Sequence, residues 1–168
     1  MCAPVPLCYN RNDGVTDHAC LVRPVRRPSH HYHTINRLEE PVKLEHVAFN
    51  VPEPAAMAAW YVEHLGLKLV LAAEQAPYMH FLSDDAGSLI ELYNNPKGPI
   101  FDYEEVNPYS LHLAFSTSDM DGDIARLVAA GARQWAEIEL TPRGDRLVFL
   151  RDPWEVTVQL VQRSSPLA

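Results

Sequence analysis

Two histidines and an acid–amide pair recur at matched positions along this chain. His46 begins the stretch HVAF, and His112 begins the stretch HLAF 66 positions later. In the same register Gln159 follows Glu91 by 68 positions. Imidazole nitrogens and carboxylate or amide oxygens are common ligands of divalent metal ions. A repeat of this size indicates two similar supersecondary units, and its matched polar residues suggest a four-ligand site between them.

Such a site would act as a Lewis acid. A divalent ion held by imidazole and carboxylate, with open positions, polarises a carbonyl or enediolate that chelates it. With two neutral histidines, Glu91 and the neutral Gln159, the site keeps a net charge of about +1, which stabilises an enediolate. Glu91 can also remove a proton beside the polarised carbonyl, whereas Gln159 cannot. Glu91 is therefore the candidate catalytic residue.

The elements that must hold these residues follow the same repeat. Apolar periodicity and turn residues predict strands at 42–51, 67–73, 78–83 and 88–94 with a helix at 55–65, then strands at 110–116, 134–140, 146–151 and 156–161 with a helix at 119–130. Both copies read β-α-β-β-β, which predicts an α+β fold. Alternation of side chains along a strand lets Glu91 and Gln159 each line a cavity.

The chain divides by composition into a leader and a body. Residues 1–40 hold all three cysteines and several prolines without a periodic apolar pattern, and are expected to form a flexible leader. The body, 41–168, contains the repeat: module 1 at about 42–95, a linker at 96–108, and module 2 at about 109–163.

Composition narrows the class of protein. The formal charge is −8, and because residues 1–40 contribute +1, the body carries −9. An acidic body argues against nucleic acid and anionic membranes as partners. No apolar run approaches the length of a membrane span. With no cysteine after Cys20 the body needs no disulfide, which fits a cytoplasmic protein.

Four segments carry a family resemblance: LEHVAFNV, AAWYVEHLGLKLV, GSLIELY and LVFLRDPWEVTVQLVQR. They resemble the vicinal oxygen chelate superfamily, which contains glyoxalase I, extradiol dioxygenases and the fosfomycin- and bleomycin-resistance proteins. The last segment departs from the family's pattern, which usually has Gly where this chain has Glu155 and often has Glu where it has Gln159.

The resemblance implies a fold and a site. The two modules are expected to form an open eight-stranded half-barrel with flanking helices. The metal ligands are expected to be His46, Glu91, His112 and Gln159, holding Zn, Ni, Mn or Fe. The implied function is that of a glyoxalase-like lyase or isomerase, similar to lactoylglutathione lyase, acting on a small α-oxo or thiol-adduct substrate. A homodimer is the expected assembly.

Two other functions remain open. His46, His112 and Glu91 also make a set of two histidines and one carboxylate, which suits Fe(II) and an extradiol-type dioxygenase. Some members of the superfamily keep the fold without a metal, so a small-molecule binding or resistance protein is the third hypothesis. Epimerisation would require a second base, for which Glu155 is the nearby candidate, although an exposed place at the strand start is the simpler expectation.

Overall fold

The computed structural model describes residues 42–167, so the expected leader at 1–40 lies outside the described residues. The first module contains β1 (Val47–Asn50), α1 (Pro54–Leu65), β2 (Lys68–Ala72), β3 (His80–Ser83) and β4 (Leu89–Tyr93). The second contains β5 (Leu113–Ser116), α2 (Met120–Ala129), β6 (Arg133–Gln134), β7 (Glu139–Leu140), β8 (Arg146–Arg151) and β9 (Thr157–Gln162). The α+β class and the two βαβββ-like modules are thereby confirmed. None of the helices in this range has the length and apolarity to span a membrane.

The two modules have the same strand connectivity. The first sheet has the order β1-β4-β3-β2 and the second β5-β9-β8-β6, with β7 also paired to β8. In each sheet the first and last strands of the module pair in parallel, and the remaining pairs are antiparallel. The strand predicted at 134–140 is split into β6 and β7. Within residues 42–167, no ladder joins one sheet to the other.

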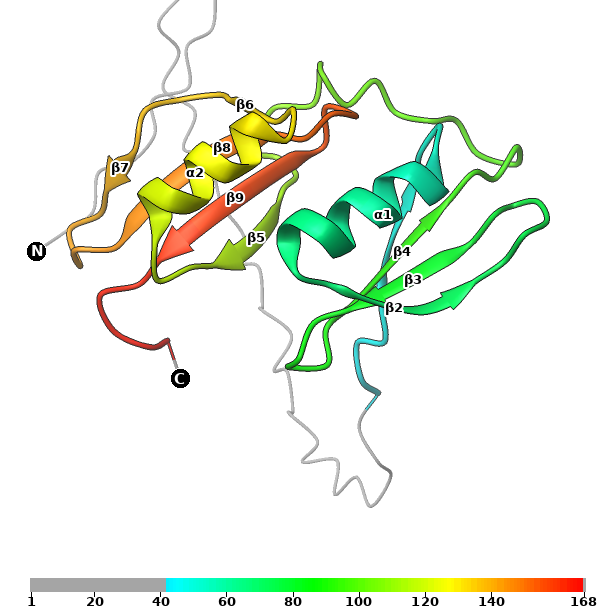
Figure 1. Cartoon of the computed structure of the whole chain (residues 1–168), viewed down its shortest axis with the longest axis horizontal. Coiled ribbons are helices and arrows are strands. Elements are labelled where there is room, and N and C mark those ends of the chain that lie inside the picture. Colours follow the sequence, from blue (N-terminus) through cyan, green and yellow to red (C-terminus); the bar gives the residue numbers. More distant parts are fainter. Residues whose placement is uncertain (1–41, 168) are drawn as a thin grey trace, which may run out of the picture. The chain divides into compact units, whose positions relative to one another are not determined.

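Each helix covers one face of its own sheet (Figure 1). Helix α1 packs against β2, β3 and β4, and α2 packs against β6 and β9. Pro54 stands at the first turn of α1, where a missing N–H costs nothing, and Gly66 ends the helix with a φ of +73°. The apolar residues of the strands that face the helices are buried, and the opposite faces remain available for polar side chains.

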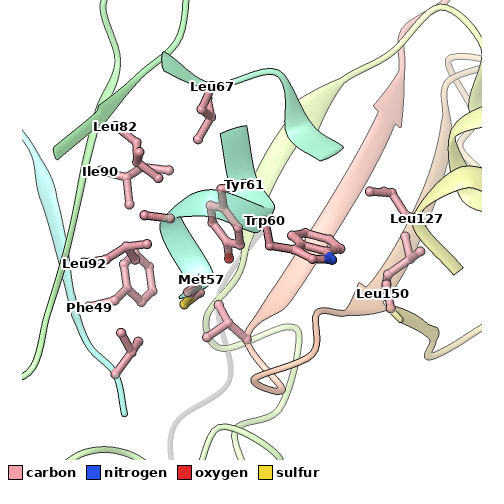
Figure 2. Close-up of a cluster of buried hydrophobic side chains, with 14 of the residues drawn as sticks. Phe49, Met57, Trp60, Tyr61, Leu67, Leu82, Ile90, Leu92, Leu127 and Leu150 are labelled. Atoms are coloured by element: carbon pink, nitrogen blue, oxygen red, sulfur yellow. The ribbon is translucent and has the colours of Figure 1, made fainter. Parts of the chain in front are cut away.

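Two aromatic residues of α1 connect the modules (Figure 2). Trp60 Nε1 donates to the carbonyl oxygen of Ala130 at the end of α2, at 2.8 Å. Tyr61 is fully buried, and its hydroxyl donates to Asp152 Oδ2 at 2.8 Å. Both rings belong to a buried cluster that includes Leu127 and Leu150 of the second module. Residues of both modules therefore form one hydrophobic core.

The hairpins that join the last two strands of each module are closed in the same way. Asp84 Oδ1 accepts hydrogen bonds from the backbone N–H groups two and four positions further along, at 2.9 and 2.8 Å. Asp152 Oδ1 accepts the equivalent bonds at 2.9 Å each. The residue three positions after the aspartate is Gly87 in the first hairpin, with φ +90°, and Glu155 in the second, with φ +63°. A left-handed backbone favours glycine, so Glu155 occupies a strained position.

The strain at Glu155 predicts an unusual order of stabilities. Glu155→Ala and Glu155→Gly both remove the side chain, but only glycine relieves the left-handed backbone. We expect the free energy of unfolding of Glu155→Gly to be about 1 kcal/mol larger than that of Glu155→Ala. The reciprocal substitution, Gly87→Ala, should destabilise by a similar amount. Equal denaturation midpoints for the two Glu155 variants would contradict this assignment.

The two hairpin aspartates should respond oppositely to pH. Burial raises the pKa of Asp152 to about 6, whereas backbone N–H donors, chiefly that of Ser88, lower the pKa of Asp84. Between about pH 4 and pH 6 the folded state binds a proton at Asp152 that the unfolded state releases, so this group's contribution to stability falls as the pH rises. Relative to Asp152→Asn, the wild type should lose on the order of 2 kcal/mol of unfolding free energy from pH 4 to pH 7.

Asp84→Asn provides the matched control for that measurement. Because the pKa of Asp84 is lowered in the folded state, the wild type should lose stability relative to this variant as the pH falls below 4. Urea denaturation of the three proteins across this pH range gives both slopes. Slopes of the same sign would show that Asp152 is not desolvated as described.

Candidate functional site

His46 and Glu91 meet on the face of the first sheet opposite α1. Parallel pairing of β1 with β4 places Ala48 beside Glu91, and His46, two residues before Ala48, lies on the same face. The distance from His46 Nε2 to Glu91 Oε2 is 3.3 Å. Phe81 of β3 pairs with Glu91, and its ring meets the imidazole of His46 edge to face, with centroids 5.3 Å apart. The structure thus brings together the two site residues predicted in this module.

The second module repeats this arrangement with an amide in place of the acid. Gln159 of β9 pairs with Ala114 of β5 on one side and with Phe149 of β8 on the other. His112, two residues before Ala114, meets the ring of Phe149 edge to face at the same centroid separation, 5.3 Å. His112 and Gln159 therefore border one phenylalanine, as His46 and Glu91 border Phe81 in the first module.

Both histidines have their Nδ1 atom occupied by an oxygen. His112 Nδ1 lies 2.7 Å from the carbonyl oxygen of Pro108. A carbonyl only accepts, so Nδ1 of His112 carries the proton and Nε2 carries the lone pair. His46 Nδ1 contacts the Glu45 carboxylate. Metal-binding histidines usually have their second nitrogen held in this way, so the donor atoms and their orientation fit a divalent ion.

The electrostatic environment of His46 is acidic. The hydrogen bond to Glu45 raises the pKa of His46, partial burial opposes the change, and the charges of Glu45 and Glu91 raise it further. The side chain of Glu91 is only 13% exposed, against 33% for His46. Glu91 is thus a half-buried carboxylate in contact with an imidazole.

The four predicted ligands form two pairs. Within residues 42–167, no group of three or more His, Cys, Asp or Glu side chains is close enough to hold a metal ion. His46 and Glu91 are one pair, and His112 and Gln159 lie at equivalent places around Phe149. These donor types suit a divalent ion, but among residues 42–167 the two pairs are not gathered into one cluster.

Glu155, the candidate second base, and His80, a further histidine of the first module, both lie elsewhere. Glu155 forms an ion pair with Arg133, at 2.6 Å, on the surface of the second module. His80 pairs with Leu92, so it faces the helix side of the first sheet, and its Nδ1 lies 2.8 Å from the carbonyl oxygen of Tyr78. Among the described residues, two carboxylates contact a predicted ligand histidine. Glu45 contacts Nδ1 of His46, and Glu91 lies near its Nε2 on the face opposite α1.

The sequence did not indicate an aromatic cluster beside His112. The rings of Tyr109 and Trp135 both meet Phe149 edge to face, with centroids 5.1 and 6.2 Å away, and they meet each other at 6.2 Å. Tyr109 is 68% exposed and Trp135 40%. Tyr109 lies in the turn before β5 and Trp135 just after β6, so only the folded second module brings them together.

A cleft of about 660 Å³ also borders His46. It lies between the start of β1, the end of α1, the hairpin between β3 and β4, and β5. Its lining includes Val47 on one side and Ala114 on the other. The edges of β1 and β5, which no hydrogen-bond ladder joins, thus face the same open space.

Comparisons with known proteins agree with this architecture. The family model described as the Glyoxalase/Bleomycin resistance protein/Dioxygenase superfamily matches residues 43–160. No curated protein matches the sequence. A glyoxalase family protein from Bacillus cereus is similar in structure, with a TM-score of 0.65 at 19% identity, over 76% of this chain and 98% of that one.

Two further solved structures show the same fold. TnmS3, an antibiotic binding protein from Streptomyces sp. CB03234, has a TM-score of 0.58 at 22% identity and covers 75% of this chain and 99% of its own. The fosfomycin resistance protein FosX from Listeria monocytogenes, complexed with Mn(II) and sulfate, has a TM-score of 0.59 at 17% identity, over 76% of this chain and 94% of that one.

The hydrogen bonds to Nδ1 predict the tautomers of both histidines. In metal-free protein, at a pH high enough for both imidazoles to be neutral, ¹⁵N chemical shifts should identify the Nδ1–H form at His46 and at His112. Glu45→Ala should leave His112 unchanged, because a backbone carbonyl holds it. The same substitution should shift His46 toward the Nε2–H form, because the Glu91 carboxylate, 3.3 Å from Nε2, is the acceptor that remains. A protonated Nε2 at His112 would contradict the orientation described here.

Proposed function

The chain belongs to the Glyoxalase/Bleomycin resistance protein/Dioxygenase superfamily, and from that premise we propose that it is a glyoxalase-like metalloenzyme, a lyase or isomerase. The superfamily fold serves enzymes and resistance proteins alike. We propose a small α-oxo or thiol-adduct substrate and a divalent ion, Zn, Ni, Mn or Fe, as cofactor. The observation that carries the proposal is the repeated set of histidine, phenylalanine and acid or amide, in which an oxygen holds Nδ1 of each histidine and Nε2 of His46 faces Glu91.

The residues that would hold the ion are His46, Glu91, His112 and Gln159. When bound, the ion would supply Lewis-acid polarisation of a chelating substrate oxygen. The imidazoles donate Nε2, Glu91 donates a carboxylate oxygen, and Gln159 donates an amide oxygen. This set leaves about one unit of positive charge on a divalent site. That charge favours an oxyanion on the substrate.

Glu91 is the base in this proposal. Its carboxylate lies 3.3 Å from His46 Nε2, on the face opposite α1. A carboxylate there can take a proton from the carbon next to the substrate carbonyl and return it to the neighbouring carbon. Gln159 has no group that can take a proton, so a single base must serve both transfers. A 1,2-proton shuttle meets that condition, whereas epimerisation through two bases does not.

A specific observation favours a second function, that of a metal-free small-molecule binding protein. The exposed rings of Tyr109 and Trp135 stand beside Phe149 and His112, and exposed aromatic groups of this kind bind planar or apolar ligands. The separation of the four ligands into two pairs supports the same alternative. The structural similarity to TnmS3, an antibiotic binding protein, is consistent with it.

We propose a cytoplasmic homodimer as the working assembly. Strand β2 pairs only with β3 in the described sheet, so its outer edge is open. Leu69, Val70 and Leu71 on that strand are each more than half exposed. An apolar edge strand of this kind pairs readily with a second copy.

Exchanging the acid and the amide tests the metalloenzyme proposal. Glu91→Gln keeps an oxygen ligand but removes the base, so metal should bind more weakly and turnover should fall by about a hundredfold or more. Gln159→Glu adds a carboxylate, so metal should bind more tightly while proton-shuttle activity is retained. Elemental analysis of protein purified without a metal-affinity column, with a methylglyoxal–thiol adduct assay, measures both effects.

The histidines provide the matching loss-of-metal variants. His46→Ala and His112→Ala should each strip the metal, and oxygen uptake with Fe(II) separates dioxygenase from isomerase activity. If Glu91→Gln leaves metal content and turnover unchanged, Glu91 is a structural residue and the metalloenzyme proposal fails. If the wild type binds none of Zn²⁺, Ni²⁺, Mn²⁺ or Fe²⁺, the binding-protein function replaces it.

A further inference from the structure

Arg151, at the end of β8, is a buried cation that donates its hydrogen bonds to backbone carbonyls. The residue is only 2% exposed. Its Nη1 donates to the carbonyl oxygens of Tyr103 and Glu155 at 2.6 and 2.8 Å, and its Nη2 donates to those of Glu104 and Val106 at 3.3 and 2.7 Å. Three of these four acceptors belong to the linker between the modules. The guanidinium therefore holds the linker against the second sheet.

The position of Arg151 on its strand places it beside the candidate site. Arg151 follows Phe149 by two residues on β8, so both side chains lie on the face opposite α2. The equivalent residue of the first module is Ser83, whose hydroxyl donates locally, to the carbonyl oxygen of Asp84 at 2.8 Å. The contact with the linker thus distinguishes the second module from the first.

A tight turn connects the linker to His112. The residue after Val106 is Asn107, whose Oδ1 and carbonyl oxygen accept from the three backbone N–H groups of residues 109–111, at 2.9, 2.8 and 3.3 Å. Inside this turn Pro108 is buried, and its carbonyl oxygen lies 2.7 Å from His112 Nδ1. Because three hydrogen bonds close so short a turn, the position of the Pro108 carbonyl depends on where the chain is held at Val106.

We infer that Arg151 is a positioning residue for His112. By fixing the linker at Val106, it places the Pro108 carbonyl where that oxygen holds the imidazole in its Nδ1–H form and leaves the lone pair on Nε2. A guanidinium suits this task because its two Nη groups donate in fixed directions to carbonyls of different residues, whereas an ammonium is a single point charge. The inference rests on the proposed function only in treating His112 as a metal ligand.

A charge-matched substitution tests this role. Arg151→Lys keeps the positive charge but replaces the two-pronged donor with a single ammonium. In full-length, metal-free protein, at a pH high enough for neutral imidazoles, ¹⁵N chemical shifts give the ratio of the Nδ1–H to the Nε2–H form. At His112 this ratio should fall about fivefold, the factor expected for loss of one neutral hydrogen bond. At His46 it should not change, because a side chain of the first module holds that ring.

Two further variants separate this role from a general effect on stability. Arg163→Lys shortens another arginine of the same module, whose Nη1 donates to the buried Asp145 carboxylate at 2.9 Å, and should leave the tautomer ratio of His112 unchanged. Asn107→Ala removes one hydrogen bond of the turn and leaves Arg151 in place, so the ratio should fall as it does in Arg151→Lys. This variant also tests the same path if Arg151→Lys does not fold.

Zinc affinity relates the positioning of His112 to the proposed function. Loss of a group that orients a metal-binding histidine weakens metal binding by about tenfold or more. Calorimetric titration with Zn²⁺ should show a loss of that size for Arg151→Lys. Arg163→Lys should bind Zn²⁺ as tightly as the wild type does.

Several outcomes would overturn the inference. An unchanged ratio at His112 in both Arg151→Lys and Asn107→Ala would show that the linker does not orient the imidazole. Equal changes at His46 and His112, or an equal change in Arg163→Lys, would show a general loosening of the fold instead. If the wild type binds no metal, the proposed function fails, whereas the tautomer ratios of the metal-free protein still decide the role of Arg151.

Discussion

The buried hydrogen bond between Tyr61 and Asp152 is the constraint on which the arrangement of the two modules depends. Tyr61 comes from α1, and Asp152 closes the hairpin before β9 by accepting two backbone N–H groups. A carboxylate that is only 2% exposed costs free energy unless all its partners are in place. The helix of the first module and the last strand of the second are thereby held in one relative position, and Gln159 lies on that strand.

The two hairpin aspartates show where the two modules differ. Asp84 is half-buried and its hairpin contains Gly87, whereas Asp152 is buried and its hairpin contains the strained Glu155. The first module keeps an ionisable carboxylate, Glu91, beside its histidine, and the second has the neutral Gln159. The buried hydrogen bonds are thus found in the second hairpin, and the ionisable carboxylate beside a histidine is found in the first module.

The sequence was sufficient for the local elements and for the proximity of His46 to Glu91, because both follow from strand alternation and the repeat. It was less successful at strand ends. Strand β1 begins only at Val47, since Val42 and Leu44 are exposed and have no neighbouring strand to pair with. The contact of Tyr61 with Asp152 spans 91 positions and depends on how the modules pack, which no local pattern encodes.

Separation of the two sheet faces explains why a fold of this kind can serve different activities. The face against each helix holds the apolar residues that stabilise the protein, such as Leu92 and Val158, whereas the opposite face holds His46, Glu91 and their counterparts. An exchange of acid and amide on the face opposite the helices leaves the core unchanged, because a carboxylate and an amide have nearly the same volume. The chemistry of the site can therefore change by single residues while the packing that positions it stays the same.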